Sequence, residues 1–147
     1  MKDLPQAGSV DADSLIVPAE FIDNMRQHVA ACTPEEACGL LAGCGRLVSR
    51  VIPIRNMLHS PVRFKMDTQE QLRAFLSLDA DGLDLLAIFH SHPNGPGYPS
   101  PTDIAEAFYP ETAMLIWYLQ SGRWRYNGFK VENGVVTKIL LKTNIIR

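Results

Sequence analysis

The sequence predicts a single domain of the α/β class with mixed α+β character, in which helices flank a curved mixed β-sheet. Two observations predict this fold. The hydrophobic patterns follow the order β-α-β-β-α-β-α-β-β-β along the chain, and the run LDLLAIF (83–89) is as apolar as a strand buried on both faces. With 147 residues, the chain can bury one ordinary core. We expect a polar N-terminal leader over residues 1–13 and the domain over residues 14–147.

The first 54 residues are predicted to contain three strands and one helix. SLIVPAEF (14–21) contains a short strand and leads, with Pro18 in the first turn, into a helix that ends near Cys32. ACGLLAGCG (37–45) indicates a strand because its glycines would weaken a helix, and a partner strand, LVSRVIPI (47–54), follows. One face of the first helix should be buried, the face that carries Phe21, Met25, His28 and Val29.

An irregular segment, Arg55 to Asp67, precedes the second helix and ends in a strand-like FKM (64–66). The helix TQEQLRAFLSL (68–78) should be capped by Thr68, since Gln71 follows three residues later.

Beyond the buried strand 83–89, a loop rich in proline and glycine leads to a third helix at SPTD (100–103). Three more strands follow, of which the last two are joined by Asn133-Gly134, a strong hairpin signal. These strands are TAMLIWYLQ (112–120), RWRYNGFKV (123–131) and VVTKILLKT (135–143).

Charge and cysteine content narrow the classes of function. With 14 Lys plus Arg against 16 Asp plus Glu, the net charge of -2 gives no reason to expect nucleic acid or an anionic membrane as partner. No apolar run approaches the roughly 18–20 residues that span a bilayer. The N-terminus lacks a basic start and an apolar core, and the cysteines Cys32, Cys38 and Cys44 are odd in number, which indicates a cytoplasmic protein with buried, structural thiols.

Two histidines end the buried strand, and together they suggest half of a metal site. Because strand side chains alternate, His90 and His92 point the same way, and Asp103 lies eleven residues further on. Two nitrogens and one carboxylate with an open fourth position are typical of catalytic zinc. Ser100 and Asp103 also suit a plain helix cap, and the two interpretations are compatible, because a helix start can hold Asp103 while its outer oxygen reaches an ion.

A hydrolytic site also needs a base, and Glu35 and Glu36 stand just before the strand 37–45. TPEE (33–36) could be a capping box instead, but no convincing helix follows it. Glu36 shares a face with Cys38, so it could lean over the histidines if this strand neighbours 83–89.

Taken together, PEEACGLLAG, HSHP and PSPTD resemble the signature of the JAMM (MPN-plus) metallopeptidases, and the segment after Arg55 resembles their small stand-alone prokaryotic branch. The resemblance covers roughly residues 15–142 and implies an MPN/JAMM-like, deaminase-like fold. It implies that His90, His92 and Asp103 bind one zinc ion per chain. It also implies that Glu36 is the general base for the attacking water and that Ser100 helps to hold the oxyanion.

The family resemblance also implies the substrate. It predicts hydrolysis of a peptide or isopeptide bond after the C-terminal Gly-Gly of a ubiquitin-like or sulfur-carrier protein, whose tail Ser60, Pro61 and Arg63 are candidates to contact. A homodimer is compatible with the family. The alternative is a non-catalytic MPN-type scaffold that serves only in dimerisation.

Two other metal enzymes fit less well. An iron oxygenase would use a different ligand order, because its common arrangement is His-x-Asp or His-x-Glu followed by a distant histidine. A nucleobase deaminase would need cysteines after Cys44, and the sequence has none there.

Overall fold

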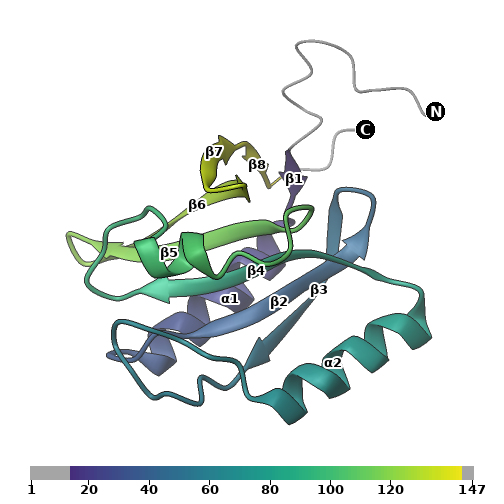
Figure 1. Cartoon of the computed structure of the whole chain (residues 1–147), viewed down its shortest axis with the longest axis horizontal. Coiled ribbons are helices and arrows are strands. Elements are labelled where there is room, and N and C mark those ends of the chain that lie inside the picture. The colour runs from purple at the N-terminus through teal and green to yellow at the C-terminus, as the bar shows by residue number, and fades with distance from the viewer. Residues whose placement is uncertain (1–13, 144–147) are drawn as a thin grey trace.

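A computed structural model describes residues 14–143, so the expected leader lies outside the described residues. The elements follow the predicted order, with one further short strand near the C-terminal end (Figure 1). The helices are α1 (Ala19–Cys32), α2 (Thr68–Asp81) and α3 (Pro101–Ala105). The strands are β1 (Leu15–Ile16), β2 (Cys38–Cys44), β3 (Leu47–Ile54), β4 (Asp84–His92), β5 (Ala113–Gln120), β6 (Arg123–Glu132), β7 (Val135–Ile139) and β8 (Leu141–Lys142).

Within the described residues, the strands form a single mixed sheet of order β7-β6-β5-β4-β2-β3-β1-β8. β4 and β5 are parallel, as are the pairs that β1 forms with β3 and β8, while the other neighbours are antiparallel. The parallel pair requires a crossover, which the loop after β4 and α3 supply. The predicted mixed α/β class is confirmed.

The prediction of one continuous last strand over residues 135–143 is wrong. The structure has two strands there, β7 and β8, which are separated by Leu140. β7 pairs with β6, whereas β8 pairs with β1 at the other end of the strand order. The backbone N–H of Leu15 donates to the Leu140 carbonyl at 3.0 Å, and that of Val17 donates to the Lys142 carbonyl at 2.7 Å. Because Leu140 alone separates β7 from β8, the two ends of the curved sheet come together at this residue.

The two long helices cover opposite faces of the sheet (Figure 1). α1 buries Met25 and Val29 as predicted, and Phe21 is partly buried beside them. Pro18 lies at the N-cap, one residue before the predicted first turn. On the other face, α2 packs through Ala74 in a second cluster of buried residues.

The cap of α2 is Asp67 and not Thr68, which is the first helical residue. The Asp67 carboxylate accepts hydrogen bonds from the backbone N–H groups of Gln69 and Glu70 at 2.9 and 3.0 Å. A carboxylate is at least as good a cap as a hydroxyl, so the aspartate one residue upstream takes the position.

The structure confirms the predicted hairpin turn but not the strand predicted at the end of the irregular segment. Asn133 and Gly134 have φ values of 52° and 78° and close the β6–β7 hairpin as predicted. FKM forms no strand, because only Met66 is paired, in an isolated bridge with Asn56.

The cysteines are all free thiols, but they differ in burial. Cys38 is buried and Cys32 is partly buried, whereas Cys44 is exposed, so the prediction of three buried thiols is wrong for Cys44. Cys44 ends β2 at the edge of the tight turn to β3, where the chain leaves the core. Among residues 14–143, no helix has the length and apolar character to cross a membrane.

Candidate metal centre

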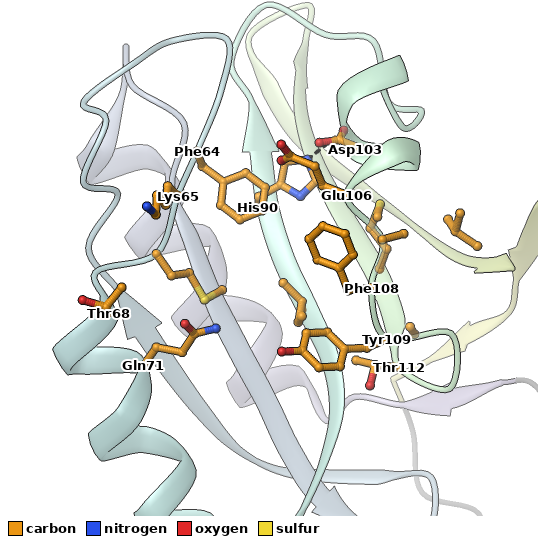
Figure 2. A pocket seen from close by; sticks show the side chains of 16 residues that line it. Phe64, Lys65, Thr68, Gln71, His90, Asp103, Glu106, Phe108, Tyr109 and Thr112 are labelled. Atoms are coloured by element: carbon orange, nitrogen blue, oxygen red, sulfur yellow. Dashed lines mark hydrogen bonds and ion pairs between the residues drawn. The ribbon is translucent and has the colours of Figure 1, made fainter. Parts of the chain in front are cut away.

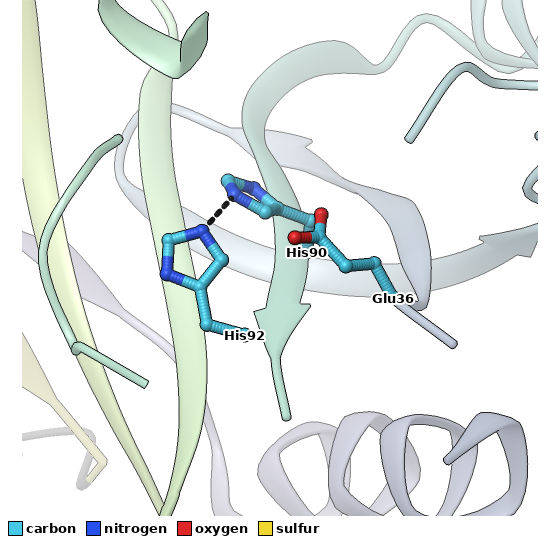
Figure 3. Close-up of side chains that lie close together, drawn as sticks. All are labelled: Glu36, His90 and His92. Atoms are coloured by element: carbon cyan, nitrogen blue, oxygen red, sulfur yellow. Dashed lines mark hydrogen bonds between the residues drawn. The ribbon is translucent and has the colours of Figure 1, made fainter. Parts of the chain in front are cut away.

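The two histidines lie at the C-terminal end of β4, beside the start of β2. Cys38 is paired with His90, so β2 neighbours the histidine strand as the prediction for Glu36 required. Glu36 stands two residues before Cys38, and the three polar side chains meet on one face of the sheet (Figure 3). All three residues are buried: His90 is 1% exposed, Glu36 4% and His92 6%.

Asp103 returns to the histidines because α3 starts beside the end of β4. Ser100 is the N-cap, and its Oγ accepts a hydrogen bond from the Asp103 N–H at 3.0 Å. The Ser100 N–H donates in turn to Oδ2 of Asp103 at 2.9 Å, which completes a capping box. The predicted cap is therefore real, and it fixes the orientation of the Asp103 side chain.

Three atoms converge at this point and could hold a metal ion. Nε2 of His90, Nε2 of His92 and Oδ2 of Asp103 lie 3.1 Å from one another in each of the three pairs. A tetrahedral zinc ion with bonds of about 2.0–2.1 Å holds its ligand atoms about 3.3 Å apart, so the triangle has close to the required size. The oxygen that accepts from Ser100 is the same oxygen that faces the histidines, and not the outer one that we expected.

The chemistry of these atoms also suits a cation. Nδ1 of His92 lies 2.7 Å from the carbonyl oxygen of Pro96, so this nitrogen carries the proton and donates it. Nε2 of His92 then presents a lone pair toward His90 and Asp103. A carbonyl that orients a ring in this way is the usual support of a metal-binding histidine.

Glu36 lies close to these atoms but farther away than Asp103. A carboxylate oxygen of Glu36 and one ring nitrogen from each histidine all lie within 4.8 Å of one another (Figure 3). Glu36 thus stands beside the convergent atoms without being one of the three that lie 3.1 Å apart.

Burial and neighbouring charge shift the protonation of the site. Burial raises the pKa of Glu36 to about 7; His92 opposes this shift and Asp103 adds to it. Burial alone would also raise the pKa of Asp103, but the two histidine rings beside it and the hydrogen bond from the Ser100 N–H lower it below its ordinary value. Asp103 therefore stays ionised near neutral pH, while Glu36 can both accept and release a proton.

A cavity of about 240 Å³ opens beside the convergent atoms (Figure 2). His90 and Asp103 form part of its wall, and most of the lining is apolar. One wall comes from the segment before α2, where Phe64 stacks on the His90 ring with 4.6 Å between centroids. The opposite wall comes from the segment after α3, which contributes Glu106, Phe108 and Tyr109.

The predicted substrate contacts lie near this cavity but not in its lining. The carbonyl of Ser60 accepts a hydrogen bond from the Glu36 N–H at 2.8 Å, and Arg63 lies 3.6 Å from Glu106. Pro61 lies between them in the chain, on the exposed surface. The next residues, Phe64 to Met66, are the ones that line the cavity.

Asn56 is a contributor that the sequence analysis missed. Its Nδ2 group donates to the carbonyls of Glu36 and Arg63, and its Oδ1 accepts from the N–H groups of Leu58 and Lys65, at 3.0–3.1 Å. An asparagine in an irregular segment with no periodicity gives little signal of such a role.

The fold and the three convergent donor atoms define the class of protein, a domain of the JAB type with a candidate metal centre. The sequence model of the family described as prokaryotic homologues of the JAB domain matches residues 18–129. The chain therefore belongs to this family.

Curated relatives carry the names of enzymes. A probable TtuB-protein conjugate cleaving protease of Thermus thermophilus is 46% identical over 63% of this chain and 63% of its own length. A CysO-cysteine peptidase of Mycobacterium tuberculosis is 32% identical over 84% of this chain and 87% of its own length. A desampylase of Pyrococcus furiosus is 37% identical over 79% of this chain and 80% of its own length. The match thus spans less than two thirds of the Thermus protein and most of the other two.

Solved structures agree with the fold. A protein of Desulfitobacterium hafniense has a TM-score of 0.78 and 34% identity over 86% of this chain and 90% of its own. A JAB1/MPN domain protein of Archaeoglobus fulgidus has a TM-score of 0.57 and 14% identity over 87% of this chain and 99% of its own. At this low identity, the likeness supports the fold alone.

Proposed function

We propose that the protein is a zinc-dependent metallopeptidase that hydrolyses the peptide or isopeptide bond after the C-terminal Gly-Gly of a ubiquitin-like or sulfur-carrier protein. The observation that carries the proposal is the convergence of His90, His92 and Asp103 at 3.1 Å, with Glu36 buried beside them. The relatives' names support it, because they describe cleavage of a protein conjugate and of a CysO-cysteine link.

In this proposal His90, His92 and Asp103 hold one zinc ion per chain through the three convergent atoms. When bound, the ion would supply Lewis acidity, which lowers the pKa of a coordinated water and polarises a carbonyl oxygen. A non-catalytic scaffold would need neither this donor set nor a buried carboxylate beside it, which favours the enzyme.

Glu36 would move the proton. Its carboxylate accepts a proton from the attacking water as the water oxygen bonds to the carbonyl carbon, and it delivers that proton to the amine nitrogen as the C–N bond breaks. A pKa raised to about 7 suits both halves of this transfer.

Ser100 would stabilise the developing oxyanion. Its Oγ accepts from the Asp103 N–H, a contact that uses the oxygen and leaves the hydroxyl proton to donate. A donor held rigid by a helix cap can stabilise charge without reorganising.

The substrate tail would approach through the cavity that His90 and Asp103 share with the metal site. Nδ1 of His90 is buried and, within the described residues, has no hydrogen-bond partner. A tail that enters the cavity would pass along the wall that the His90 ring helps to form, next to the convergent atoms. Ser60, Pro61 and Arg63 would then contact the tail farther from the bond that is cut.

We further propose that residues 14–147 form one domain of a cytoplasmic enzyme and that this enzyme pairs as a homodimer. The three free thiols are consistent with a reducing compartment. Light scattering of the purified protein would report whether it pairs.

The direct test is cleavage of a purified sulfur-carrier protein extended past its Gly-Gly end, followed by mass spectrometry. We expect release of the extension, with the carrier ending at glycine. A matched carrier with Ala-Ala in place of Gly-Gly should be cut much more slowly. Cleavage at other positions, or equal cleavage of both carriers, would contradict the proposed specificity.

A further inference from the structure

The loop between β4 and α3 lies against β5 and β6. A Cβ atom added to Gly97 would lie 2.4 Å from the ring of Tyr118 on β5, so the loop backbone rests directly on that ring. The next residue, Tyr98, packs edge-on against Phe129 of β6, with 5.5 Å between ring centroids. The loop thus follows the surface of these two strands.

Asn127 of β6 adds the polar contact. Its Nδ2 group donates a hydrogen bond to the Gly97 carbonyl at 2.9 Å. Asn127 is paired with Ile116, which is paired with His90, so the asparagine shares a face of the sheet with the histidine. The contact joins residues 30 positions apart in the chain.

The residue before Gly97 supports the metal centre. The Pro96 carbonyl is the acceptor of the His92 Nδ1 proton at 2.7 Å, and it is one peptide unit away from the carbonyl that Asn127 holds. We propose that Asn127 is a positioning residue: by fixing Gly97 it fixes the Pro96 carbonyl, and through it the tautomer and ring direction of His92. This inference rests on the metal-binding part of the proposed function.

The substitution Asn127→Asp tests the contact with almost no change of volume. It replaces the donor with an oxygen that would face the Gly97 carbonyl and push the loop away. Loss of a group that supports a metal ligand typically lowers metal affinity 10–100-fold. Because Asn127 acts one step further out, we expect a loss of about 10-fold, at the lower end of that range.

The measurement is zinc affinity, by competition with a chromogenic chelator and without substrate. Gln120→Glu, on the exposed end of β5, is the matched amide-to-acid control and should bind as tightly as the unaltered protein. Thermal unfolding of the metal-free proteins separates a local effect from general destabilisation. Asn127→Asp should lose affinity even if the unfolding temperatures agree.

An affinity of Asn127→Asp equal to that of Gln120→Glu would overturn the inference. If Asn127→Asp does not fold, Gly97→Ala tests the same loop, because the added methyl would push it off Tyr118. Unchanged zinc affinity in that variant would also overturn the inference. Absence of zinc binding by the unaltered protein would instead overturn the proposed function, so the two failures are distinguishable.

Discussion

The backbone N–H of Ala37 donates a hydrogen bond of 2.8 Å to Oγ of Ser91, and the Ser91 N–H donates to the Ala37 carbonyl at 3.0 Å. Ala37 follows Glu36, and Ser91 separates the two histidines of β4. This pair of hydrogen bonds therefore fixes the distance between the proposed base and the proposed metal ligands. The serine of the HSHP motif has a structural task that its position in the motif alone does not reveal.

Replacing Ser91 by alanine should lower the free energy of unfolding of the protein. The Ala37 N–H would be left buried without an acceptor, which costs about 1–3 kcal/mol of unfolding free energy. Urea unfolding of the metal-free protein would measure the loss. Ser91→Thr keeps the hydroxyl and should retain most of the stability, so equal losses in both variants would show that the hydrogen bond is not the cause.

Asn56→Ala should have a larger effect on stability than Ser91→Ala. It removes four hydrogen bonds, so two carbonyls and two backbone N–H groups lose their partner, those of Glu36, Arg63, Leu58 and Lys65. Each of these groups that stays buried lowers the free energy of unfolding by about 1–3 kcal/mol. Urea unfolding should show the difference. Asn24→Ala, at an exposed position of α1, is the control and should be near neutral. An Asn56→Ala protein as stable as the control would contradict the role of Asn56 as an anchor.

Much of the fold was predictable because it depends on local patterns. The buried run before His90 identified β4, Asn133-Gly134 identified a hairpin, and Ser-Pro-x-Asp identified the start of α3. The candidate site followed from the spacing of a known signature. The strand, the hairpin and the helix start are each set by residues close together in the sequence, whereas Glu36 was assigned to the site only through the signature.

The remainder depends on contacts between distant residues. Nothing near Leu140 indicates that the chain leaves one edge of the sheet for the other, because β8 pairs with β1, a strand more than 120 residues earlier in the sequence. The choice of Asp67 over Thr68 as a cap could not be made where two good caps are adjacent. The cavity beside His90 is likewise formed by segments that only the fold brings together.

The three thiols should react at different rates. Burial raises the pKa of the Cys38 thiol to about 12, whereas Cys44 is exposed. A thiol reagent at neutral pH should therefore modify Cys44 rapidly and Cys38 only after unfolding. Peptide mapping would assign the sites, and Cys44→Ser should remove the rapid phase. Rapid modification of Cys38 in the folded protein would contradict its position in the core.

Glu36→Gln should separate metal binding from catalysis. The amide keeps the shape of the side chain but cannot accept a proton from water, so cleavage of an extended carrier should fall by about 10²–10⁴-fold. Zinc content should be unchanged, since Glu36 is not a proposed ligand. Glu35→Gln is the matched control: Glu35 lies 3.2 Å from His59 on the surface and should retain activity. An active Glu36→Gln protein would contradict the assignment of the base.

The central claim is that three side chains on β4 and α3 hold one zinc ion, and elemental analysis of the purified protein tests it most directly. We expect about one zinc ion per chain in the unaltered protein, in agreement with a site of three protein ligands. His90→Ala and Asp103→Ala should lose the zinc and keep the circular dichroism spectrum of the fold. A protein that neither carries zinc nor binds it when supplied, or an Asp103→Ala variant that retains it at full stoichiometry, would contradict the account.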